Sequence, residues 1–295
     1  MHPAPSIIFF TVFSGLGFGL LTFLGFGKPD YSGFTAFIFF LIAYVFAVGG
    51  LVASTFHLGN PQRALKAFTQ WRTSWLSREG CLAVAALTVM GFYAIGVVFL
   101  DTRWTLLGLL GAALSLATVF GTSMIYTQIT TVPRWNHWTT PVLFIGYALT
   151  GGAFLAGQTS IAAPMLLALG VLQCVVWMIG DKLFAASGST IETATGLGAM
   201  GKVRMFEAPH SSKNYLMKEM VHQIGRKHAE KLSLIAVIVG IFAPLFLVVL
   251  FRTPSAIQIP ALFLALVLHF GGTLDSQWLF FSEAKHVMGL YHGQR

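Results

Sequence analysis

The sequence predicts an all-α, polytopic membrane protein, with eight transmembrane helices in a bundle and residues 1–295 in a single integral membrane domain. Of the 295 residues, 56% are hydrophobic and only 9% are charged, whereas soluble domains carry about 25% charged residues. The mean hydropathy of +0.75 agrees with a chain whose solvent is the lipid bilayer. The apolar runs show no alternation of apolar and polar residues, so a membrane β-barrel is not expected.

Eight apolar runs define the expected helices, because a helix needs about 20 apolar residues to cross about 30 Å of hydrocarbon. In chain order they are Ser6–Gly27, Gly33–Phe56, Gly80–Leu100, Trp104–Tyr126, Thr140–Gly157, Ile161–Leu183, Leu232–Arg252 and Gln258–Phe281. The first run lacks a basic leader and a small-residue cleavage site, so we expect it to be retained. The fifth is the least regular, because Gly151 and Gly152 interrupt it.

The basic residues between these runs are unevenly shared by the two membrane faces. Lys28, Arg103 and Arg252 fall on one face, and the remaining fifteen of the 18 Lys and Arg residues fall on the other, together with both termini. Cytoplasmic loops carry an excess of basic residues, so we expect both termini to be cytoplasmic, in a bacterial inner (cytoplasmic) membrane. This distribution accounts for the net charge of +8, and no nucleic-acid partner is expected.

The longest polar connection, residues 184–231, is predicted to be cytoplasmic. It opens with small residues and closes with NYLMKEMVHQIGRKHAEKL, a helical pattern. Leu216, Met220, Ile224 and Lys227 share one face of that pattern. We therefore expect an amphipathic helix within this connection, lying on the membrane surface or docked on a partner.

The polar side chains of the membrane region gather in one short segment, HLGNPQRALKAFTQWRTSWLSRE, between the second and third runs. His57 closes the second run and Glu79 lies just before the third, so the connection can bring both to one pocket. Arg72, Ser74 and Arg78 lie between them. The tryptophans near the predicted helix ends are expected to form the interfacial aromatic belt.

An imidazole and a carboxylate at a membrane boundary suit a carrier of two electrons and two protons with an apolar tail. Neutral histidine can accept the proton of a quinol hydroxyl, and the carboxylate can relay it to water. We therefore predict a quinone site with binding residues His57, Glu79, Arg72 and Ser74 and with proton transfer through Glu79 and His57. Each residue taken alone has a simpler explanation. Glu79, as a carboxylate at a helix start, complements the helix dipole, and His57, as a histidine at the membrane boundary, contacts lipid headgroups.

The sequence lacks the residues that a haem or a metal site would need. A bis-histidine haem needs two deep histidines on facing helices, and only His269 lies deep in an apolar run, so no haem is expected. Cys81 and Cys174 have no CxxC spacing and are expected to be small packed residues, with no metal site in this chain. His269 and Asp275 lie within the eighth run, where either a proton path or a buried pair would explain them. The small residues of Ser14–Gly19 favour close helix packing.

The segments HLGNPQRALKAF…WRTSWLSREG and NYLMKEMVHQIGRKHAEKL resemble those of the membrane anchor subunit of dimethyl sulfoxide reductases, and the resemblance covers essentially the whole chain. It implies a three-subunit enzyme: a molybdopterin catalytic subunit, an iron–sulfur electron-transfer subunit and this anchor, which exchanges electrons with the menaquinone or ubiquinone pool and does not act on the substrate itself. His57 matches the histidine of the family's HLG motif and Glu79 the carboxylate of its SREG motif, both associated there with quinol binding. Arg72 and Ser74 match the motif as residues that shape the pocket.

The resemblance extends to the membrane subunits of cytoplasmic sulfite dehydrogenases, in which electrons would run towards quinone. The short length of the chain, 295 residues, slightly favours this type over the reductase type. Two other functions stay open: a proton-coupled membrane transporter, for which Gly151-Gly152, Pro164 and His269 are the relevant features, and a purely structural anchor without a quinone site.

Overall fold

The computed structural model describes residues 1–56, 60–207, 215–220, 227–253 and 256–292. Every regular element in these residues is helical, which confirms the predicted all-α class. The long helices are α1 (Pro5–Gly25), α2 (Gly33–Thr55), α3 (Trp75–Phe99), α4 (Thr105–Thr127), α5 (Thr139–Leu155), α6 (Thr159–Ala186), α10 (Ala229–Val237), α11 (Ala243–Leu250) and α12 (Gln258–Ser282). The short elements are η1 (Pro61–Phe68), α7 (Ile191–Thr195), η2 (Gly198–Met200), α8 (Tyr215–Met220), the π-helical turn η3 (Ile238–Phe242) and η4 (Val287–His292).

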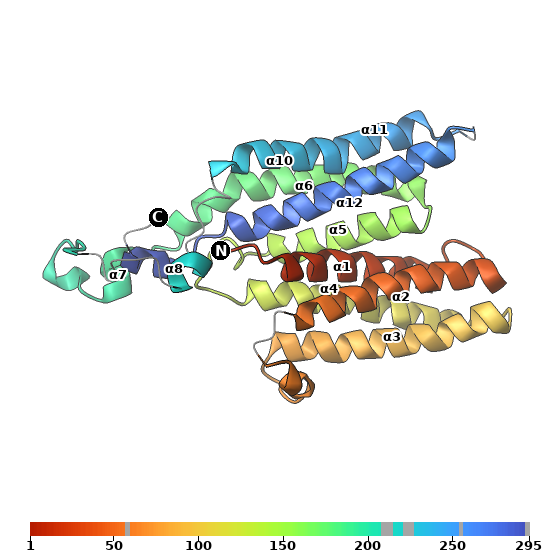
Figure 1. The fold of residues 1–295 in the computed structure, drawn as a ribbon, viewed down its shortest axis with the longest axis horizontal. Coiled ribbons are helices and arrows are strands. Elements are labelled where there is room, and N and C mark those ends of the chain that lie inside the picture. Colours follow the sequence, from red (N-terminus) through yellow and green to blue (C-terminus); the bar gives the residue numbers. More distant parts are fainter. Residues whose placement is uncertain (57–59, 208–214, 221–226, 254–255, 293–295) are drawn as a thin grey trace.

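Within the described residues, seven helical segments are long and apolar enough to cross a membrane, which makes the chain a multi-pass membrane protein. One of them, Ala229–Leu250, combines α10, η3 and α11. The predicted count of eight is not confirmed, because α5 has only 17 residues. Helix α5 ends at Leu155, just before Gly157 with its positive φ of 66°, and it still runs from one end of the bundle to the other (Figure 1).

The double glycine that interrupts the fifth run in the sequence does not break the helix, because α5 continues through both residues. Their role is packing. A Cβ atom added to Gly151 would collide with the Leu16 side chain, and one added to Gly152 would collide with the backbone of Gly19. Because Gly151 and Gly152 have no side chains, α5 can approach α1 closely.

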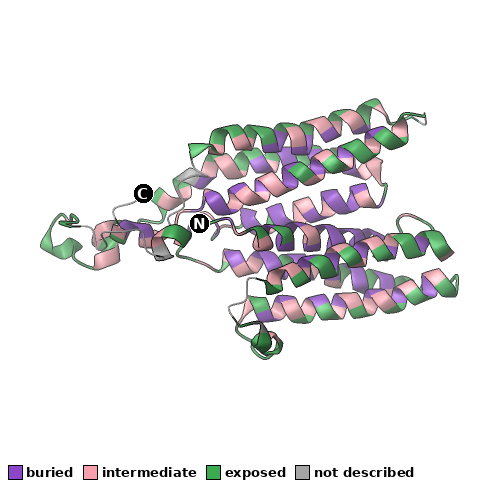
Figure 2. Cartoon of the chain, in the orientation of Figure 1, coloured by how far each residue is buried: buried purple, intermediate pink, exposed green. Residues whose placement is uncertain are grey.

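Helix α1 is the centre of the bundle. It packs against α2, α4, α5 and α12, and most of its residues are buried. Figure 2 shows buried residues along α1 and its neighbours. Gly17 faces the backbone of Ala47 in α2, and Gly19 faces the Ala148 carbonyl in α5, with no room for a Cβ at either position. This confirms that the small residues of the first run serve helix packing.

Both termini, α7, α8 and η1 lie at one end of the bundle (Figure 1). We call it the terminal end. The connection between α2 and α3 and the one between α4 and α5 lie at this end as well (Figure 1). This agrees with the prediction that successive loops lie on alternate faces of the membrane. The basic-rich connections therefore share one face, and its assignment to the cytoplasm stays a prediction.

The C-terminal helices form the other side of the bundle, where α12 packs against α10, η3, α11 and α5. Gly240 of η3 meets Gly272 of α12 backbone to backbone: a Cβ on Gly240 would lie 2.8 Å from the Gly272 Cα. A helix crossing this close depends on glycine at both positions.

Two local expectations have different outcomes. The expectation that Cys81 and Cys174 are packed is wrong, because both are exposed on the isolated chain and, as residues of membrane-spanning helices, face the surroundings of the bundle. Of the predicted amphipathic helix, the structure contains α8, whereas residues 221–226, which include Ile224, lie outside the described residues.

Candidate functional site

The helix that carries the predicted carboxylate begins earlier than expected. Helix α3 starts at Trp75, not at Gly80, so Glu79 lies inside the helix and the prediction that it precedes the helix is wrong. Ser74 is the N-cap residue, with φ −105° and ψ 124°, a position that serine favours. The first turn closes as the Arg78 amide donates to the Ser74 carbonyl over 3.0 Å. His57 lies outside the described residues.

Glu79 is buried against α4, with 4% of its surface exposed. Its Oε1 atom accepts a hydrogen bond from the Thr122 hydroxyl over 3.4 Å. Close contact is possible because Gly121 has no side chain: a Cβ there would lie 3.3 Å from the Glu79 Cα. One long hydrogen bond satisfies little of a carboxyl group's capacity, and such groups inside a membrane usually serve a function.

A groove lies beside this carboxyl at the terminal end of α3. It encloses about 540 Å³ and is lined by Trp71, Arg72, Trp75, Arg78, Cys81 and Leu82. Two indole rings and two guanidinium groups therefore surround a surface that faces away from the bundle. A volume of this size suits an organic ring system.

Arg78 fixes the shape of the groove. Its Nε donates to the Trp71 carbonyl over 3.0 Å, and its Nη2 donates to the Arg72 carbonyl over 2.6 Å. Its guanidinium carbon also lies 4.5 Å from the centre of the Trp75 ring, a cation–π distance. The loop before α3 is thus tied to the helix by a single side chain.

The predicted site residues are only partly brought together. Arg72 lines the groove, and its guanidinium carbon lies 5.5 Å from the Trp71 ring centre. Ser74 caps α3 without a side-chain cap bond and is not among the lining residues. Glu79 is not a lining residue either, although Trp75 and Leu82, about one turn before and after it on α3, are.

Five of the six groove residues, all but Arg72, were not predicted as site residues. The two tryptophans, Trp71 and Trp75, were missed because tryptophans at helix ends are usual in any membrane protein. Trp75 also packs edge-on against Phe120 of α4, with ring centres 5.9 Å apart. The available signal was their place in the polar segment, four residues apart, either side of Arg72 and Ser74.

The two ionisable groups of α12 do not pair with each other. His269 is fully buried, and its Nδ1 lies 2.7 Å from the Gly240 carbonyl oxygen. The Oδ2 atom of Asp275 has no hydrogen-bond partner among the described residues. Of the two alternatives for these residues, a His269–Asp275 pair is therefore not found, and a proton path stays untested. No cluster of three or more His, Cys, Asp or Glu side chains suited to a metal ion occurs in the described part of the chain.

Comparisons with known proteins agree with this architecture. A sequence model of the DMSO reductase anchor subunit family (DmsC) matches residues 1–282. One subunit of a sulfite dehydrogenase from Allochromatium vinosum is 28% identical over 327 aligned residues, which cover 99% of each chain. No solved structure shows significant similarity to the chain.

Proposed function

The chain belongs to the DMSO reductase anchor subunit family, and from that premise we propose that it is the quinone-reactive membrane anchor of a three-subunit oxidoreductase. Its partners would be a molybdopterin catalytic subunit and an iron–sulfur subunit. The chain itself would exchange electrons and protons with the quinone pool. The similarity to a protein named as part of a sulfite dehydrogenase supports the sulfite-oxidising type, in which electrons flow towards quinone.

The observation that carries this proposal is a buried carboxyl on the same turns of α3 that line an aromatic groove at the terminal end. Glu79 is 4% exposed and has one hydrogen bond of 3.4 Å, while the groove beside it has two indole walls. Flat aromatic walls suit the ring of a quinone. The open side of the groove would admit an isoprenoid tail from the lipid.

In this proposal each side chain has a distinct task. Trp71 and Trp75 hold the ring, and Arg72 and Arg78 place positive charge beside its oxygens. Glu79 exchanges a proton with one ring oxygen and His57 with the other. Because Trp75 and Leu82 flank Glu79 on the helix, one of them must turn aside when a ring oxygen meets the carboxyl.

The terminal end would face the cytoplasm of a bacterial cell and receive the iron–sulfur subunit. From the sequence, fifteen of the 18 Lys and Arg residues are expected on this face, and Arg63 and Lys66 lie on the short helix η1, which precedes the groove residues in the chain. A cationic face favours an acidic docking partner. Electrons would then pass between the groove and the nearest cluster of that subunit.

The proposal is tested in the assembled complex by two activities. Replacing His57 with Ala or Glu79 with Gln should reduce quinone-linked turnover at least about 100-fold, the scale of a lost acid–base group. Activity with an artificial dye that bypasses the anchor should not change. Glu207→Gln, at an exposed glutamate outside the membrane helices, is the matched control and should keep both activities.

The same experiment separates the alternatives. If quinone turnover survives in both variants, Glu79 and His57 are not the site; if no quinone binds at all, the chain is a structural anchor. A transporter would need a substrate path through broken helices, whereas Gly151 and Gly152 lie in a continuous helix and serve packing.

A further inference from the structure

A small cavity inside the bundle has Thr122, the hydrogen-bond partner of Glu79, in its lining. It is enclosed by α1, α4, α5 and α12, and its polar lining residues are Thr11, Ser14, Thr122, Tyr147, Thr273 and Gln277. Its volume of about 20 Å³ is enough for one water molecule. Thr122 therefore touches both the Glu79 carboxyl and this cavity.

The polar atoms around the cavity are arranged to hold water. The amide Nε2 of Gln277 is buried and has no partner among the described residues. The hydroxyls of Thr11 and Ser14 donate to carbonyls of their own helix over 3.0 and 2.6 Å, which leaves their lone pairs to accept. A buried donor beside buried acceptors, with space for one molecule between them, is the usual setting of an internal water.

A chain of hydroxyl groups continues from this cavity. The Tyr147 hydroxyl lies 2.8 Å from the Ser276 Oγ and 3.0 Å from the Gln173 Oε1. Ser276 also donates to Gln173 over 3.0 Å. Three helices, α5, α6 and α12, thus contribute one side chain each to a hydrogen-bonded cluster inside the apolar bundle.

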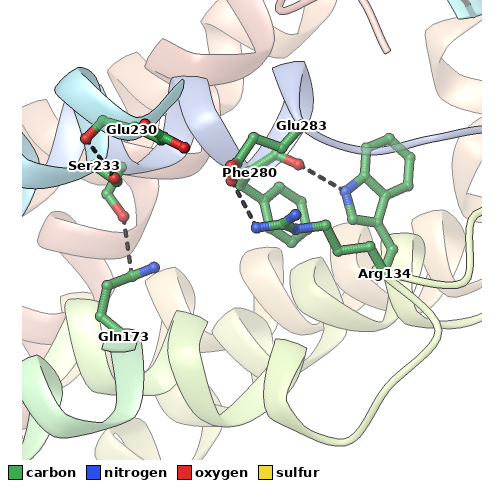
Figure 3. Close-up of polar contacts among 8 residues, drawn as sticks. Arg134, Gln173, Glu230, Ser233, Phe280 and Glu283 are labelled. Atoms are coloured by element: carbon green, nitrogen blue, oxygen red, sulfur yellow. Dashed lines mark hydrogen bonds and ion pairs between the residues drawn. The ribbon is translucent and has the colours of Figure 1, made fainter. Parts of the chain in front are cut away.

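The chain of hydroxyl groups leads to a second cavity nearer the terminal end, which Gln173 and Ser276 also line. It also offers about 20 Å³, and its polar lining includes Gln173, Ser276, Arg134 and Glu283. The Arg134 Nη2 atom lies 2.6 Å from the Glu283 Oε2, and Figure 3 shows these two residues close together, with Gln173 on the neighbouring helix. Glu283 directly follows α12, at the end of the bundle that holds both termini.

We propose that Glu79, Thr122, the first cavity, Tyr147, Ser276, the second cavity and Glu283 form a proton route from the quinone site to the water at the terminal end. This inference rests on the proposed function, because it assumes that Glu79 exchanges protons with quinone. It adds the path and the side of the membrane on which the protons are exchanged.

Each step moves one proton and leaves the chain unchanged. When Glu79 passes on a proton, a water in the first cavity takes it through Thr122 and donates to the Tyr147 oxygen. Tyr147 passes its own proton to Ser276, which passes its own to a water in the second cavity. Glu283 accepts that proton and releases it to bulk water, and the hydroxyls then turn back. Gln173 and Gln277 hold the hydroxyls and the water in place. For quinone reduction the same steps run in reverse.

The route has a consequence for energy conversion. Its mouth at Glu283 lies at the same end of the bundle as the groove, so protons would not cross the membrane during quinone turnover. Reconstituted complex should exchange protons with the compartment at the terminal end and leave the pH of the opposite compartment unchanged.

The test uses the whole complex in liposomes with three variants. Tyr147→Phe and Ser276→Ala each remove one relay hydroxyl, and Gln277→Leu replaces the amide that holds the water. Each should slow quinone-linked turnover about tenfold or more and raise its solvent deuterium isotope effect. The KM for quinone and the dye activity should stay as in the unchanged complex, and Ser276→Thr should restore the rate.

Thr22→Val is the matched control. The Thr22 hydroxyl is also buried in the bundle but bonds only to the Phe18 carbonyl of its own helix, over 2.8 Å. It should leave turnover and the isotope effect unchanged, and retained dye activity reports correct assembly of every variant.

Two results would overturn the route, and both are distinguishable from failure of the proposed function. If Glu79→Gln abolishes quinone turnover while Tyr147→Phe and Ser276→Ala keep the normal rate and isotope effect, protons leave Glu79 another way. If a pH dye in the compartment opposite the terminal end reports the proton change, the mouth is on the wrong side. If Glu79→Gln itself retains turnover, the proposed function fails first.

Discussion

Glu79 and His269 are both buried ionisable groups inside the membrane bundle, yet their hydrogen bonds differ. Glu79 has one hydrogen bond of 3.4 Å, to Thr122, which lines a cavity inside the bundle, and its neighbour Arg78 lines the groove. His269 is fully buried: its Nδ1 lies 2.7 Å from the Gly240 carbonyl oxygen, its ring centre lies 5.3 Å from that of Phe154, and its Nε2 has no hydrogen-bond partner among the described residues. A carboxyl held by one long hydrogen bond can exchange a proton, whereas an imidazole bonded to the backbone of the neighbouring helix joins the two helices.

The difference at His269 has a structural origin in the π-helical turn η3. A π turn shifts the hydrogen-bond ladder of its helix, and the Gly240 carbonyl in this turn meets the imidazole of the neighbouring helix instead. Gly272, one turn after His269 on α12, meets the same glycine. Position inside the membrane therefore does not identify a reactive group; its contacts do.

The largest effect should come from Glu79→Gln. Quinone-linked turnover should fall at least about 100-fold, while the thermal unfolding temperature of the complex should hold or rise, because an amide is cheaper to bury than a carboxylate. Paired measurements of turnover and thermal unfolding check this. Loss of both together would mean that Glu79 is a structural residue like His269.

His269→Ala should give the opposite pattern. Removing a fully buried ring leaves a cavity, and large-to-small changes of aromatic core residues cost about 3–5 kcal/mol. Denaturant unfolding in detergent should show this loss, and the molecules that remain folded should keep their quinone KM. A normal unfolding profile with a raised KM for quinone would place His269 in the quinone site and would contradict its structural role.

Gly272→Ala should destabilise the chain by about 1–3 kcal/mol, the usual cost of overpacking. The added methyl group would collide with the Gly240 backbone, so α12 and η3 must separate. Gly271→Ala is the control, because a Cβ there meets nothing within 4 Å. Equal stability of the two variants would show that the close crossing is not needed.

Arg78→Lys should give the smallest effect, a several-fold rise in the quinone KM with little change in stability. Lysine keeps the charge but cannot span the Trp71 and Arg72 carbonyls with a planar fork, so the groove should lose its fixed shape. Steady-state kinetics at varied quinone concentration would measure it. Cys81→Ser, on the same groove, removes no such tie, and a larger effect there would contradict this role for Arg78.

The sequence was sufficient for the features that hydropathy controls. The helical class, the long apolar segments and the side-by-side placement of the basic connections follow from run length and charge. It was insufficient for α3, because Trp75 and Leu76 already belong to the helix while Arg78 and Glu79 interrupt the apolar run. A charged pair is tolerated there because Arg78 reaches backbone carbonyls and Glu79 turns to α4.

The rest of the site depends on contacts that a single sequence does not contain. Thr122 is 43 residues from Glu79, and Ser276 is 129 residues from Tyr147. Apolar runs also do not say which helix face meets lipid, which is why Cys81 was expected to be packed and is exposed. Only the assembled bundle brings these side chains into one place.

The central claim is that quinone binds in the groove in front of Glu79, and a photoreactive quinone tests it most directly. The label is activated in the assembled complex, and the modified residues are mapped by peptide mass spectrometry. Our account predicts labelling within residues 71–82, competed by unlabelled quinone and greatly reduced when Trp75 is replaced by Ala. Competed labelling confined to other helices, with residues 71–82 unmodified, would contradict it.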